Sequence, residues 1–342
     1  MNAVVLVGGE GTRLRPLTET IPKPLVPFMN RPFLDHVLDH LAEHGVDEVV
    51  CSSPYLETVF HAFLETREGR LPSVRWITET EPLGTAGAIA GALDLLDGTF
   101  LALNGDILTD MDLGALVELH RARNAVATIA LHRVEDARPF GLVEAERDGR
   151  VLAFREKPGE PVPGAINAGV YVLEPAALAG VPPGRMVSIE RETYPELIGG
   201  GAPVYSAVAS GYWLDLGTPE AYLRAHADAL DGRIAEYRGL SRPLLAPGAR
   251  MEPGAAVGPY VVMAPGAVVA AGADVDTSVL HEGATVAGRA RVRSSILGPG
   301  AAVGAGAVVR DAVLAERARV GDGARLAGAR VAPGEVVGAA AG

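Results

Sequence analysis

The chain of 342 residues carries a formal net charge of −12 at pH 7, which argues against nucleic acid as a partner. Its single cysteine, Cys51, excludes an internal disulfide and a cysteine-built metal site. We expect no membrane span, because no apolar run reaches about 18 residues, and no signal peptide, because no basic segment precedes the first apolar run. These features predict a cytoplasmic protein, and its length predicts two domains.

The chain opens with a short apolar run, residues 3–7, that is typical of a buried strand in a parallel sheet. The glycine-rich turn Gly8-Gly9-Glu10-Gly11 follows, and such a turn can bring backbone N–H groups close to an anion. Open α/β sheets bind ligands at the carboxyl ends of their strands. The turn matches neither the P-loop, which requires Lys and Ser or Thr after its last glycine, nor the dinucleotide fingerprint, which requires glycine where Leu14 stands.

Beyond the turn, helical and strand patterns alternate up to residue 232. Helices are predicted at 34–41, with Asn30 as a possible cap and Gly45 as a stop, and at 85–95, 113–120 and 218–230. Strands are predicted at 46–51, 100–103 and 125–132, with 141–145, 151–155 and 167–173 as an added mixed subsheet. This order predicts an α/β domain over 1–232 with a doubly wound, mostly parallel, Rossmann-like sheet.

From residue 245 to 342 the pattern changes, because apolar residues recur every six positions among Pro-Gly-Ala and Gly-Ala-Gly clusters. Clear examples are Leu245, Met251, Val257, Met263, Val269 and Val275. This period is the hexapeptide signature of a parallel β-helix, in which stacked triangular coils bury an apolar column. The register slips near residues 279–280, where we expect loops or irregular turns. The flat, nearly neutral faces of such a coil favour subunit contact, so a homo-oligomer is predicted.

Lysine is almost absent from the chain. Of 30 Lys and Arg residues, only Lys23 and Lys157 are lysines, and they lie in the motifs Pro22-Lys23-Pro24 and Glu156-Lys157-Pro158. Chance would explain two leftover lysines. We favour the interpretation that both sites require a compact ammonium group rather than a planar guanidinium.

The stretch from Gly8 to Pro24 resembles the signature of the sugar-nucleotide pyrophosphorylases, which join a nucleoside triphosphate to a sugar 1-phosphate. The resemblance implies a nucleotidyltransferase domain, a left-handed β-helix and in-line attack by the sugar phosphate on the α-phosphorus. It also implies that the glycine turn holds the β- and γ-phosphates, that Arg13 stabilises the departing pyrophosphate and that Lys23 contacts the α-phosphate. No protein nucleophile is required.

Two carboxylates are candidate ligands of Mg²⁺. Asp106 follows the apolar strand that ends in Leu103-Asn104, and Asp215 lies in a Trp-x-Asp-x-Gly-Thr motif that resembles the second metal-binding position of the family. The predicted catalytic residues are therefore Arg13, Lys23, Asp106 and Asp215. The predicted nucleotide-binding residues are Leu6, Gly8, Gly9, Gly11, Thr12, Arg13, Lys23, Glu79, Gly84, Thr85, Asn104 and Asp106.

The sugar-phosphate half is predicted from Glu156-Lys157-Pro158 and from the stretch 166–171, both of which resemble the family. Glu156 would accept hydrogen bonds from sugar hydroxyls, Lys157 would pair with the sugar phosphate, and Asn167 would bind a hydroxyl. Gly141 and Gly169 would let the backbone approach the hexose. Phe140 stands where the family commonly has tyrosine, which predicts a slightly altered pocket.

The spelling of residues 79–87, 166–171 and 188–190 looks most like that of the mannose-1-phosphate guanylyltransferases. Glu79 stands where thymidylyl- and uridylyltransferases use glutamine, and a carboxylate can accept from both donors of guanine. GTP and mannose 1-phosphate are therefore the favoured substrates, with Glu81 as an alternative base reader. Glucose-1-phosphate thymidylyl-, uridylyl- and adenylyltransferases share the framework and remain alternatives.

Two alternative classes of function make different demands on the sequence. A non-catalytic regulatory subunit would bind sugar nucleotides without turnover, but it would be expected to lose one of the four catalytic residues, and all four are present. An acyltransferase on the β-helix would need a catalytic histidine on a coil. His281 is the only histidine beyond residue 245, and it lies at the register slip.

Overall fold

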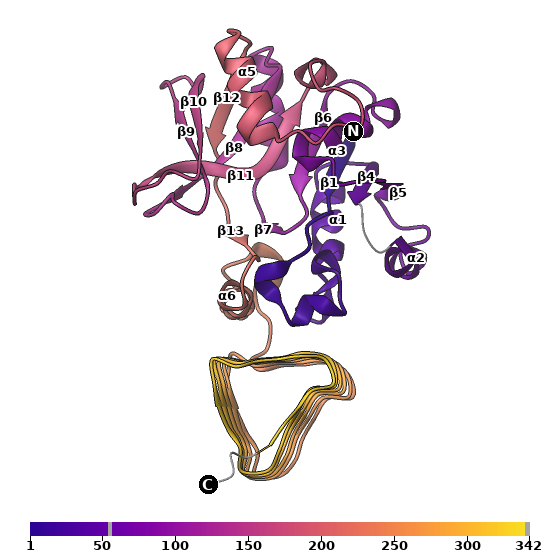
Figure 1. The fold of residues 1–342 in the computed structure, drawn as a ribbon, viewed down its shortest axis with the longest axis vertical. Coiled ribbons are helices and arrows are strands. Elements are labelled where there is room, and N and C mark those ends of the chain that lie inside the picture. The colour runs from indigo at the N-terminus through magenta and orange to yellow at the C-terminus, as the bar shows by residue number, and fades with distance from the viewer. Residues whose placement is uncertain (54–56, 339–342) are drawn as a thin grey trace. The chain divides into compact units, whose positions relative to one another are not determined.

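The computed structural model describes residues 1–53 and 57–338 (Figure 1). They form two compact units. The first comprises residues 1–9 and 36–213, and the second comprises residues 10–35 and the chain from 214 onward. The segment 10–35 therefore belongs to the same compact unit as the C-terminal coil. Within the described part of the chain, no helix has both the length and the apolar character needed to span a membrane.

The first unit is built on a nine-stranded sheet. Its path runs β10-β9-β11-β6-β1-β4-β5, and β8 pairs with both β11 and β12. The strands are β1 (Asn2–Leu6), β4 (Glu48–Ser53), β5 (Ser73–Thr78), β6 (Phe100–Asn104), β8 (Ala127–Val134), β9 (Gly141–Ala145), β10 (Val151–Glu156), β11 (Gly164–Leu173) and β12 (Val204–Val208). The strands β6, β1, β4 and β5 are parallel, as predicted for a doubly wound fold.

Strand β1 lies in the middle of this parallel part, which explains its apolar sequence. Val5 is paired with Cys51 on one side and with Leu103 on the other, and all three are buried. The end of β1 and the end of β6 approach so closely that a Cβ atom at Gly105 would lie 2.7 Å from the carbonyl oxygen of Leu6. Glycine is therefore required at this position, immediately before Asp106.

The helices are α1 (Phe33–Glu43), α2 (Glu57–Glu65), α3 (Gly84–Gly91), α4 (Leu113–Ala122), α5 (Tyr194–Gly199) and α6 (Pro219–Leu230). Short helical turns are η1 (Thr12–Leu14), η2 (Leu17–Glu19), η3 (Lys23–Leu25), η4 (Leu93–Leu95), η5 (Pro175–Leu178), η7 (Ala235–Tyr237) and the π-helical η6 (Ile189–Thr193). The strands β2 (Pro27–Phe28) and β3 (Arg31–Pro32) form a hairpin, and β7 (Ile107–Thr109) and β13 (Trp213–Asp215) are short.

Several details differ from the sequence prediction. Asn30 does not cap α1, because it lies in the turn between β2 and β3 with a φ of 66° and its amide donates to the carbonyl of Met263. The helix predicted at 85–95 ends at Gly91 and is followed by η4. The segments 141–145, 151–155 and 167–173 join the main sheet as antiparallel strands, since β11 pairs directly with β6. Helix α2 and strand β5 were not predicted.

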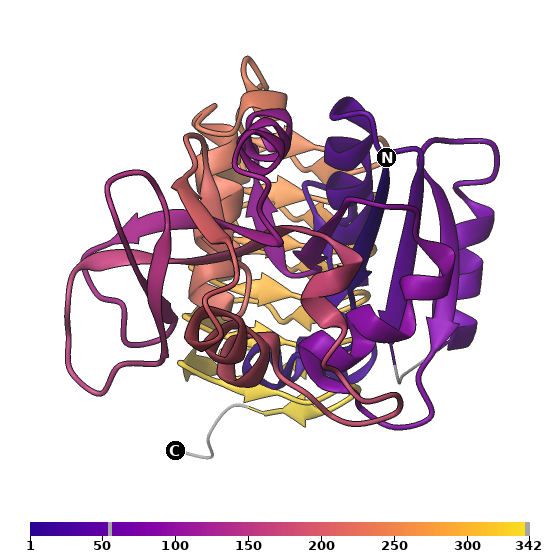
Figure 2. The same ribbon diagram turned by 90° about the horizontal axis from the view of Figure 1, so that it is seen from above.

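The C-terminal coil has three faces, and its rungs superimpose as a triangle in Figure 1 and stack on one another in Figure 2. One face holds β14 (Leu244–Leu245), β17 (Val262–Met263), β20 (Val279–Leu280), β23 (Ile296–Leu297), β26 (Val313–Leu314) and β29 (Arg330–Val331). The second holds β15 (Arg250–Met251), β18 (Val268–Val269), β21 (Thr285–Val286), β24 (Ala302–Val303), β27 (Arg319–Val320) and β30 (Val336–Val337). The third holds β16 (Ala256–Val257), β19 (Asp274–Asp276), β22 (Arg291–Arg293), β25 (Val308–Arg310) and β28 (Arg325–Ala327).

The register slips in the sequence are corners of the coil that are one residue shorter, and loops are not needed to explain them. Leu245 pairs with Met263, whereas Met263 pairs with Leu280, so the rung shortens by one residue. The shortened corner is turned by residues in the left-handed conformation that recur once per rung: Thr277 (φ 46°), Ser294 (φ 46°), Asp311 (φ 50°) and Gly328 (φ 64°). The tight corner keeps the apolar column continuous.

Candidate active site

In the second unit, the end of the glycine turn packs against the Pro-Lys-Pro motif. Gly11 has a φ of 63°, and a Cβ atom there would lie 3.0 Å from both the Lys23 Cβ and the Thr18 Cγ2. The Thr18 hydroxyl donates to the Gly11 carbonyl at 2.8 Å, and Leu14 N donates to the same oxygen at 2.9 Å. The turn is thus held in place beside the aliphatic part of Lys23.

Asp215 brings together the two predicted phosphate-binding cations. Arg13 Nη2 lies 3.4 Å from Asp215 Oδ2, and Lys23 Nζ lies 3.9 Å from Asp215 Oδ1. The Lys23 side chain is 9% exposed and that of Arg13 is 60% exposed, so the lysine is fixed while the guanidinium faces solvent. Three residues predicted from two distant stretches of the chain, 8–24 and 213–218, therefore form one cluster.

Gly217, for which the sequence predicts no role, makes this cluster possible. A Cβ atom at Gly217 would lie 2.4 Å from Arg13 Nη2 and 2.9 Å from Asp215 Oδ1. Any larger residue would therefore displace the guanidinium from the carboxylate. The Trp-x-Asp-x-Gly-Thr spelling contained the signal, but only the fold shows what the glycine accommodates.

In the first unit, the predicted base-reading residue Glu79 is already bonded to protein donors. Its side chain is buried, its Oε1 accepts from the Ser52 hydroxyl at 2.7 Å, and its Oε2 accepts from Leu83 N at 3.0 Å. A carboxylate has about four acceptor positions, so two of them are used here. Glu81, the alternative base reader, is exposed.

Gly84 and Thr85 begin helix α3, against which the strap 185–189 is packed. A Cβ atom at Gly84, whose φ is 68°, would lie 2.7 Å from the Val187 carbonyl oxygen. Val187 O accepts from the N–H of Ala86 at 2.9 Å, and Thr85 Oγ1 accepts from Ile189 N at 2.8 Å. The strap therefore fixes the N-terminus of α3 and occupies the N–H groups of Ala86 and Gly87, both of which donate to the Val187 carbonyl.

Glu190, which carried no predicted role, connects residues from both predicted halves of the site. Its Oε2 accepts from Thr85 Oγ1 at 2.8 Å and from Ser188 Oγ at 2.7 Å, and its Oε1 accepts from the Tyr171 hydroxyl at 3.4 Å. Tyr171 in turn accepts from Asn167 Nδ2 at 2.7 Å. The sequence motif Ser188-Ile189-Glu190 pointed to this residue, but its partners are distant in the sequence.

Three other predicted sugar-phosphate residues lie on neighbouring strands: Gly141 begins β9, Glu156 ends β10 and Lys157 follows it. Burial raises the pKa of Glu156, and the negative charge of Glu190 adds to the effect. Glu156 Oε1 lies 3.8 Å from Lys157 Nζ, and Glu156 Oε2 would lie 3.0 Å from a Cβ atom at Gly141. Lys157 has a φ of 51°, and its side chain is 59% exposed.

The turn at Asn167–Gly169 is held from two sides. Asn167 Oδ1 accepts from Gly169 N at 3.0 Å, and Gly169 has a φ of 71°. The Trp213 ring nitrogen donates to the Ala168 carbonyl at 2.8 Å, while Phe140 packs edge-on against the Trp213 ring. The phenylalanine that departs from the family pattern thus belongs to the support of this turn.

Asp106 is half-buried at the carboxyl end of β6, next to Gly105, whose N–H donates to the Leu6 carbonyl at 2.9 Å. Gly8 and Gly9 follow the neighbouring strand β1, and Asn104 ends β6. Among residues 1–53 and 57–338, no group of three or more His, Cys, Asp and Glu side chains is arranged to hold a metal ion. Asp106 and Asp215 belong to different compact units, and each carboxylate is an oxygen donor of the kind that suits the hard cation Mg²⁺.

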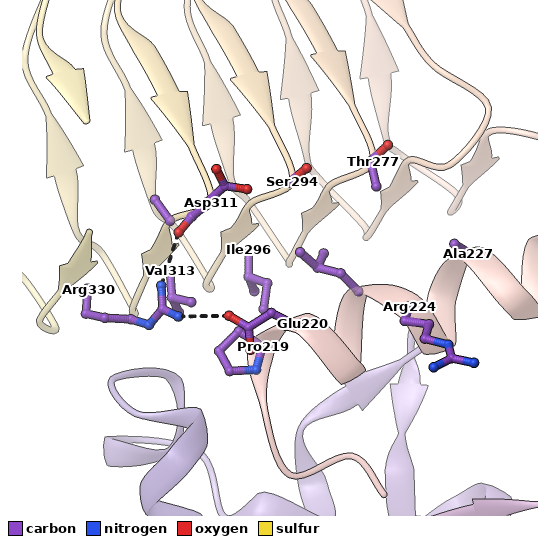
Figure 3. A pocket seen from close by; sticks show the side chains of 12 residues that line it. Pro219, Glu220, Arg224, Ala227, Thr277, Ser294, Ile296, Asp311, Val313 and Arg330 are labelled. Carbon is purple, nitrogen blue, oxygen red and sulfur yellow. Dashed lines mark hydrogen bonds and ion pairs between the residues drawn. The ribbon is translucent and has the colours of Figure 1, made fainter. Parts of the chain in front are cut away.

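A cavity of about 350 Å³ lies between α6 and the coil, within the second unit. Figure 3 shows Thr277, Ser294 and Asp311 in succession along the coil, opposite Glu220 and Arg224 of α6. Arg330 closes part of it, with Nη2 at 3.4 Å from Glu220 Oε1. His281 does not line this cavity. It is 1% exposed, and burial lowers its pKa to about 4, which gives no support to a solvent-facing catalytic histidine.

Comparison with known proteins covers both parts of the chain. The family model described as Nucleotidyl transferase matches residues 2–232, and the model described as GMPPB C-terminal domain matches residues 241–340. The mannose-1-phosphate guanylyltransferase of Mycobacterium tuberculosis is 43% identical over 234 residues, which are 68% of this chain and 65% of the relative. Mannose-1-phosphate guanylyltransferase 1 of Arabidopsis thaliana is 42% identical over 239 residues, which are 67% of this chain and 66% of the relative. The matches thus span slightly less than two thirds of these relatives.

Solved structures resemble the chain in the same region. HddC from Yersinia pseudotuberculosis is 30% identical with a TM-score of 0.59, and the match covers 66% of this chain and 97% of HddC. Its complex with GMP-PN matches with a TM-score of 0.57. A putative glucose-1-phosphate thymidylyltransferase from Bacillus anthracis, 22% identical with a TM-score of 0.60 and coverage of 66% and 94%, shares the fold.

Proposed function

This chain belongs to the nucleotidyl transferase family, and we propose that it transfers GMP from GTP to mannose 1-phosphate and releases pyrophosphate. The names of the curated relatives support this substrate pair. The observation that carries the proposal is the cluster of Arg13 and Lys23 on Asp215, because it gathers two phosphate-binding cations around a candidate metal ligand. We assign the chemistry to residues 1–232 and a supporting role to the β-helix over 245–342.

Both substrates are anions, so the site must hold them together and stabilise the charge that develops on pyrophosphate. The glycine turn, comprising Gly8, Gly9 and Gly11 with Thr12, would donate backbone N–H groups to the β- and γ-phosphates. Arg13 is exposed enough to reach the departing pyrophosphate, while the fixed Lys23 would contact the α-phosphate. Leu6, Gly84, Thr85 and Asn104 would complete the nucleotide site.

The family uses a divalent metal, and we assign Mg²⁺ to the carboxylates of Asp106 and Asp215. Both are oxygen donors of the kind that Mg²⁺ prefers, and the ion would offset the phosphate charge. Arg13 and Lys23 contact the Asp215 carboxylate, so a metal ion held by Asp215 would lie beside both cations.

On the sugar side, Glu156 and Asn167 would bind hexose hydroxyls, and Lys157 would pair with the sugar phosphate. The network through Tyr171 and Glu190 supports this assignment, because it holds Asn167 in one orientation. Gly141 and Gly169 would leave room for the ring. Nucleoside triphosphates and sugar phosphates are cytoplasmic metabolites, so a cytoplasmic location is part of the proposal.

The test is a matrix of nucleoside triphosphates against hexose 1-phosphates, read as pyrophosphate release with Mg²⁺. The highest turnover is expected with GTP and mannose 1-phosphate. Higher turnover with another pair would leave the reaction in place but replace the substrates by those of a thymidylyl-, uridylyl- or adenylyltransferase. Binding of sugar nucleotides without turnover of any pair would contradict the enzyme and indicate a regulatory subunit.

A further inference from the structure

We propose that Tyr222 and His281 are positioning residues, through which the β-helix holds Lys23 and Asp215 in place for the reaction. The inference rests on the proposed function, because it concerns turnover by that site. All the residues involved belong to the second compact unit. Tyr222 lies on α6, His281 lies on the coil directly after β20, and each is 1% exposed.

The Tyr222 hydroxyl connects two segments that are distant in the sequence. It donates a hydrogen bond to the Pro27 carbonyl, and it lies 3.3 Å from His281 Nε2. The rings of Tyr222 and His281 are stacked, with 6.2 Å between centroids and an interplanar angle of 11°. One phenol therefore joins the hairpin β2–β3 to a rung of the coil.

The chemistry of the groups fixes the direction of these bonds. A phenol has one proton, and Tyr222 gives it to Pro27, so His281 Nε2 must carry a proton and donate to the phenol oxygen. Burial lowers the pKa of His281 to about 4, so the ring is neutral at pH 7 and has a single tautomer in this arrangement. The link is therefore a directed chain from the coil through α6 to the hairpin.

A second histidine of α6 holds the same hairpin. Met29 N donates to His226 Nε2 at 3.3 Å, and His226 Nδ1 then donates to the Tyr222 carbonyl at 2.9 Å. Met29 and Asn30 both have positive φ values, 49° and 66°, which is the geometry of a type I′ turn. The Asn30 amide donates to Met263 O of the coil at 3.3 Å. The hairpin is thus fixed to both α6 and the coil.

This link ends at the proposed catalytic residues. Only Val26 separates η3, which begins with Lys23, from Pro27. Helix α6 begins at Pro219 after the cap Thr218, whose side chain accepts from Ala221 N, and Asp215 lies just before that cap. Lys23 and Asp215 are therefore each a few residues from an anchor on Tyr222, and a loosened anchor would change their separation of 3.9 Å.

The decisive variants are Tyr222→Phe, which removes only the hydroxyl, and His281→Ala. Each is expected to lower kcat about tenfold at 25 °C, since small misplacements of charged groups are costly, while KM for both substrates stays within about twofold. His281→Gln should restore most of kcat, because its amide can donate to the phenol. The double variant Tyr222→Phe/His281→Ala should have a kcat no lower than that of the single variants, because both substitutions break the same hydrogen-bonded link.

Ser295→Ala is the matched control for damage to the coil alone. Ser295 is fully buried in a nearby rung, where its hydroxyl accepts from Ala312 N at 3.2 Å. This variant should lower the thermal midpoint and leave kcat unchanged. Hydrogen exchange of a peptide covering residues 23–31 should accelerate in Tyr222→Phe and His281→Ala but not in Ser295→Ala.

The inference is overturned if Tyr222→Phe keeps the parental kcat in an active enzyme. It is also overturned if the losses of kcat in the two single variants multiply in the double variant. Unchanged hydrogen exchange over residues 23–31 in Tyr222→Phe and His281→Ala would overturn it as well, and this measurement does not depend on enzyme activity. Failure of the unmodified chain to release pyrophosphate with any substrate pair would instead contradict the proposed function.

Discussion

At the scale of single residues, Arg13 provides the most direct test of phosphate handling. Its guanidinium is exposed beside Asp215, so it is accessible to an incoming phosphate. Arg13→Ala should lower turnover at least ~100-fold, the usual scale for losing one donor of transition-state charge stabilisation, and should weaken substrate binding less. Arg15→Ala is the matched control, because Arg15 pairs with Glu10 at 3.2 Å. Steady-state kinetics within threefold of the parent for Arg13→Ala would remove the assignment.

The candidate metal ligands are tested by amide substitution. Asp106→Asn and Asp215→Asn should each abolish Mg²⁺-dependent turnover with the fold intact, because an amide is a poorer ligand for a hard cation. Turnover is measured across a Mg²⁺ titration, with circular dichroism to confirm folding. Asp110→Asn is a control that alters another carboxylate, one that accepts from Tyr212 N, and it should keep Mg²⁺-dependent turnover. Full activity of either test variant at low Mg²⁺ would exclude that residue from the metal site.

We attribute the preference for GTP to the carboxylate of Glu79. GTP should be preferred over dTTP and UTP, and Glu79→Gln should lose much of that preference, worth ~1–3 kcal/mol for a buried mismatch. Glu79 also accepts hydrogen bonds from the Ser52 hydroxyl and from Leu83 N, so the thermal midpoint of Glu79→Gln must be measured together with its substrate preference. Glu81→Gln is the comparison, since Glu81 is exposed. A larger loss of GTP preference in Glu81→Gln would transfer the role to that residue.

The role of a residue could be predicted where a single sequence motif indicates both its chemistry and its position in the site. Asp215 and Lys23 could be predicted because each lies in a recognisable sequence motif. In the fold, Lys23 Nζ lies 3.9 Å from Asp215 Oδ1. Gly217, Glu190 and Tyr222 could not be predicted, because their roles depend on partners that are distant in the sequence: Arg13, Thr85 and Pro27. Local spacing carries no information on such contacts.

At the scale of elements, the β-helix was the easiest to predict, because its period is local and repeats in every rung. The central strands were also predictable, since burial on both faces makes them continuously apolar. Strand β5 was missed because it lies at the edge of the sheet beside β4, and all of its residues are exposed or half-buried. The shortened corners of the coil were predicted as loops or irregular turns, because a single missing residue interrupts the six-residue period.

The coil should lose stability in acid because of His281. Its pKa is about 4 in the folded chain against an ordinary value of 6.5, so the unfolded chain takes up the proton first as pH falls. The contribution of neutral His281 to the free energy of unfolding is fully present above about pH 7 and is lost progressively between pH 6.5 and pH 4. The total loss is about 3 kcal/mol. Urea unfolding at pH 7 and pH 5 should show a smaller difference for His281→Gln than for the parent. Variant His61→Gln, which alters an exposed histidine, should match the parent, and an unchanged difference in His281→Gln would contradict the prediction.

At the scale of the whole molecule, the first rung of the coil leaves apolar residues uncovered. Leu245 and Met251 begin columns whose next members, Met263 and Val269, are 0% exposed. The two first members are 41% and 40% exposed, because no earlier rung covers them. An uncovered end of a β-helix also presents unpaired strand edges, which proteins normally protect. The expectation of a homo-oligomer thus acquires a specific surface, the end of the coil formed by β14 and β15.

We therefore predict that the full chain is a homo-oligomer and that Met251→Glu lowers its mass in multi-angle light scattering at micromolar concentration. A buried carboxylate at the end of the coil would have to be desolvated without a partner, which opposes association. Leu152→Glu is the matched control, because Leu152 is 53% exposed on β10 of the other compact unit. That variant should keep the parental mass. A monomeric parent would contradict the oligomer itself, whereas an oligomer unaffected by Met251→Glu would contradict only the end of the coil as its interface.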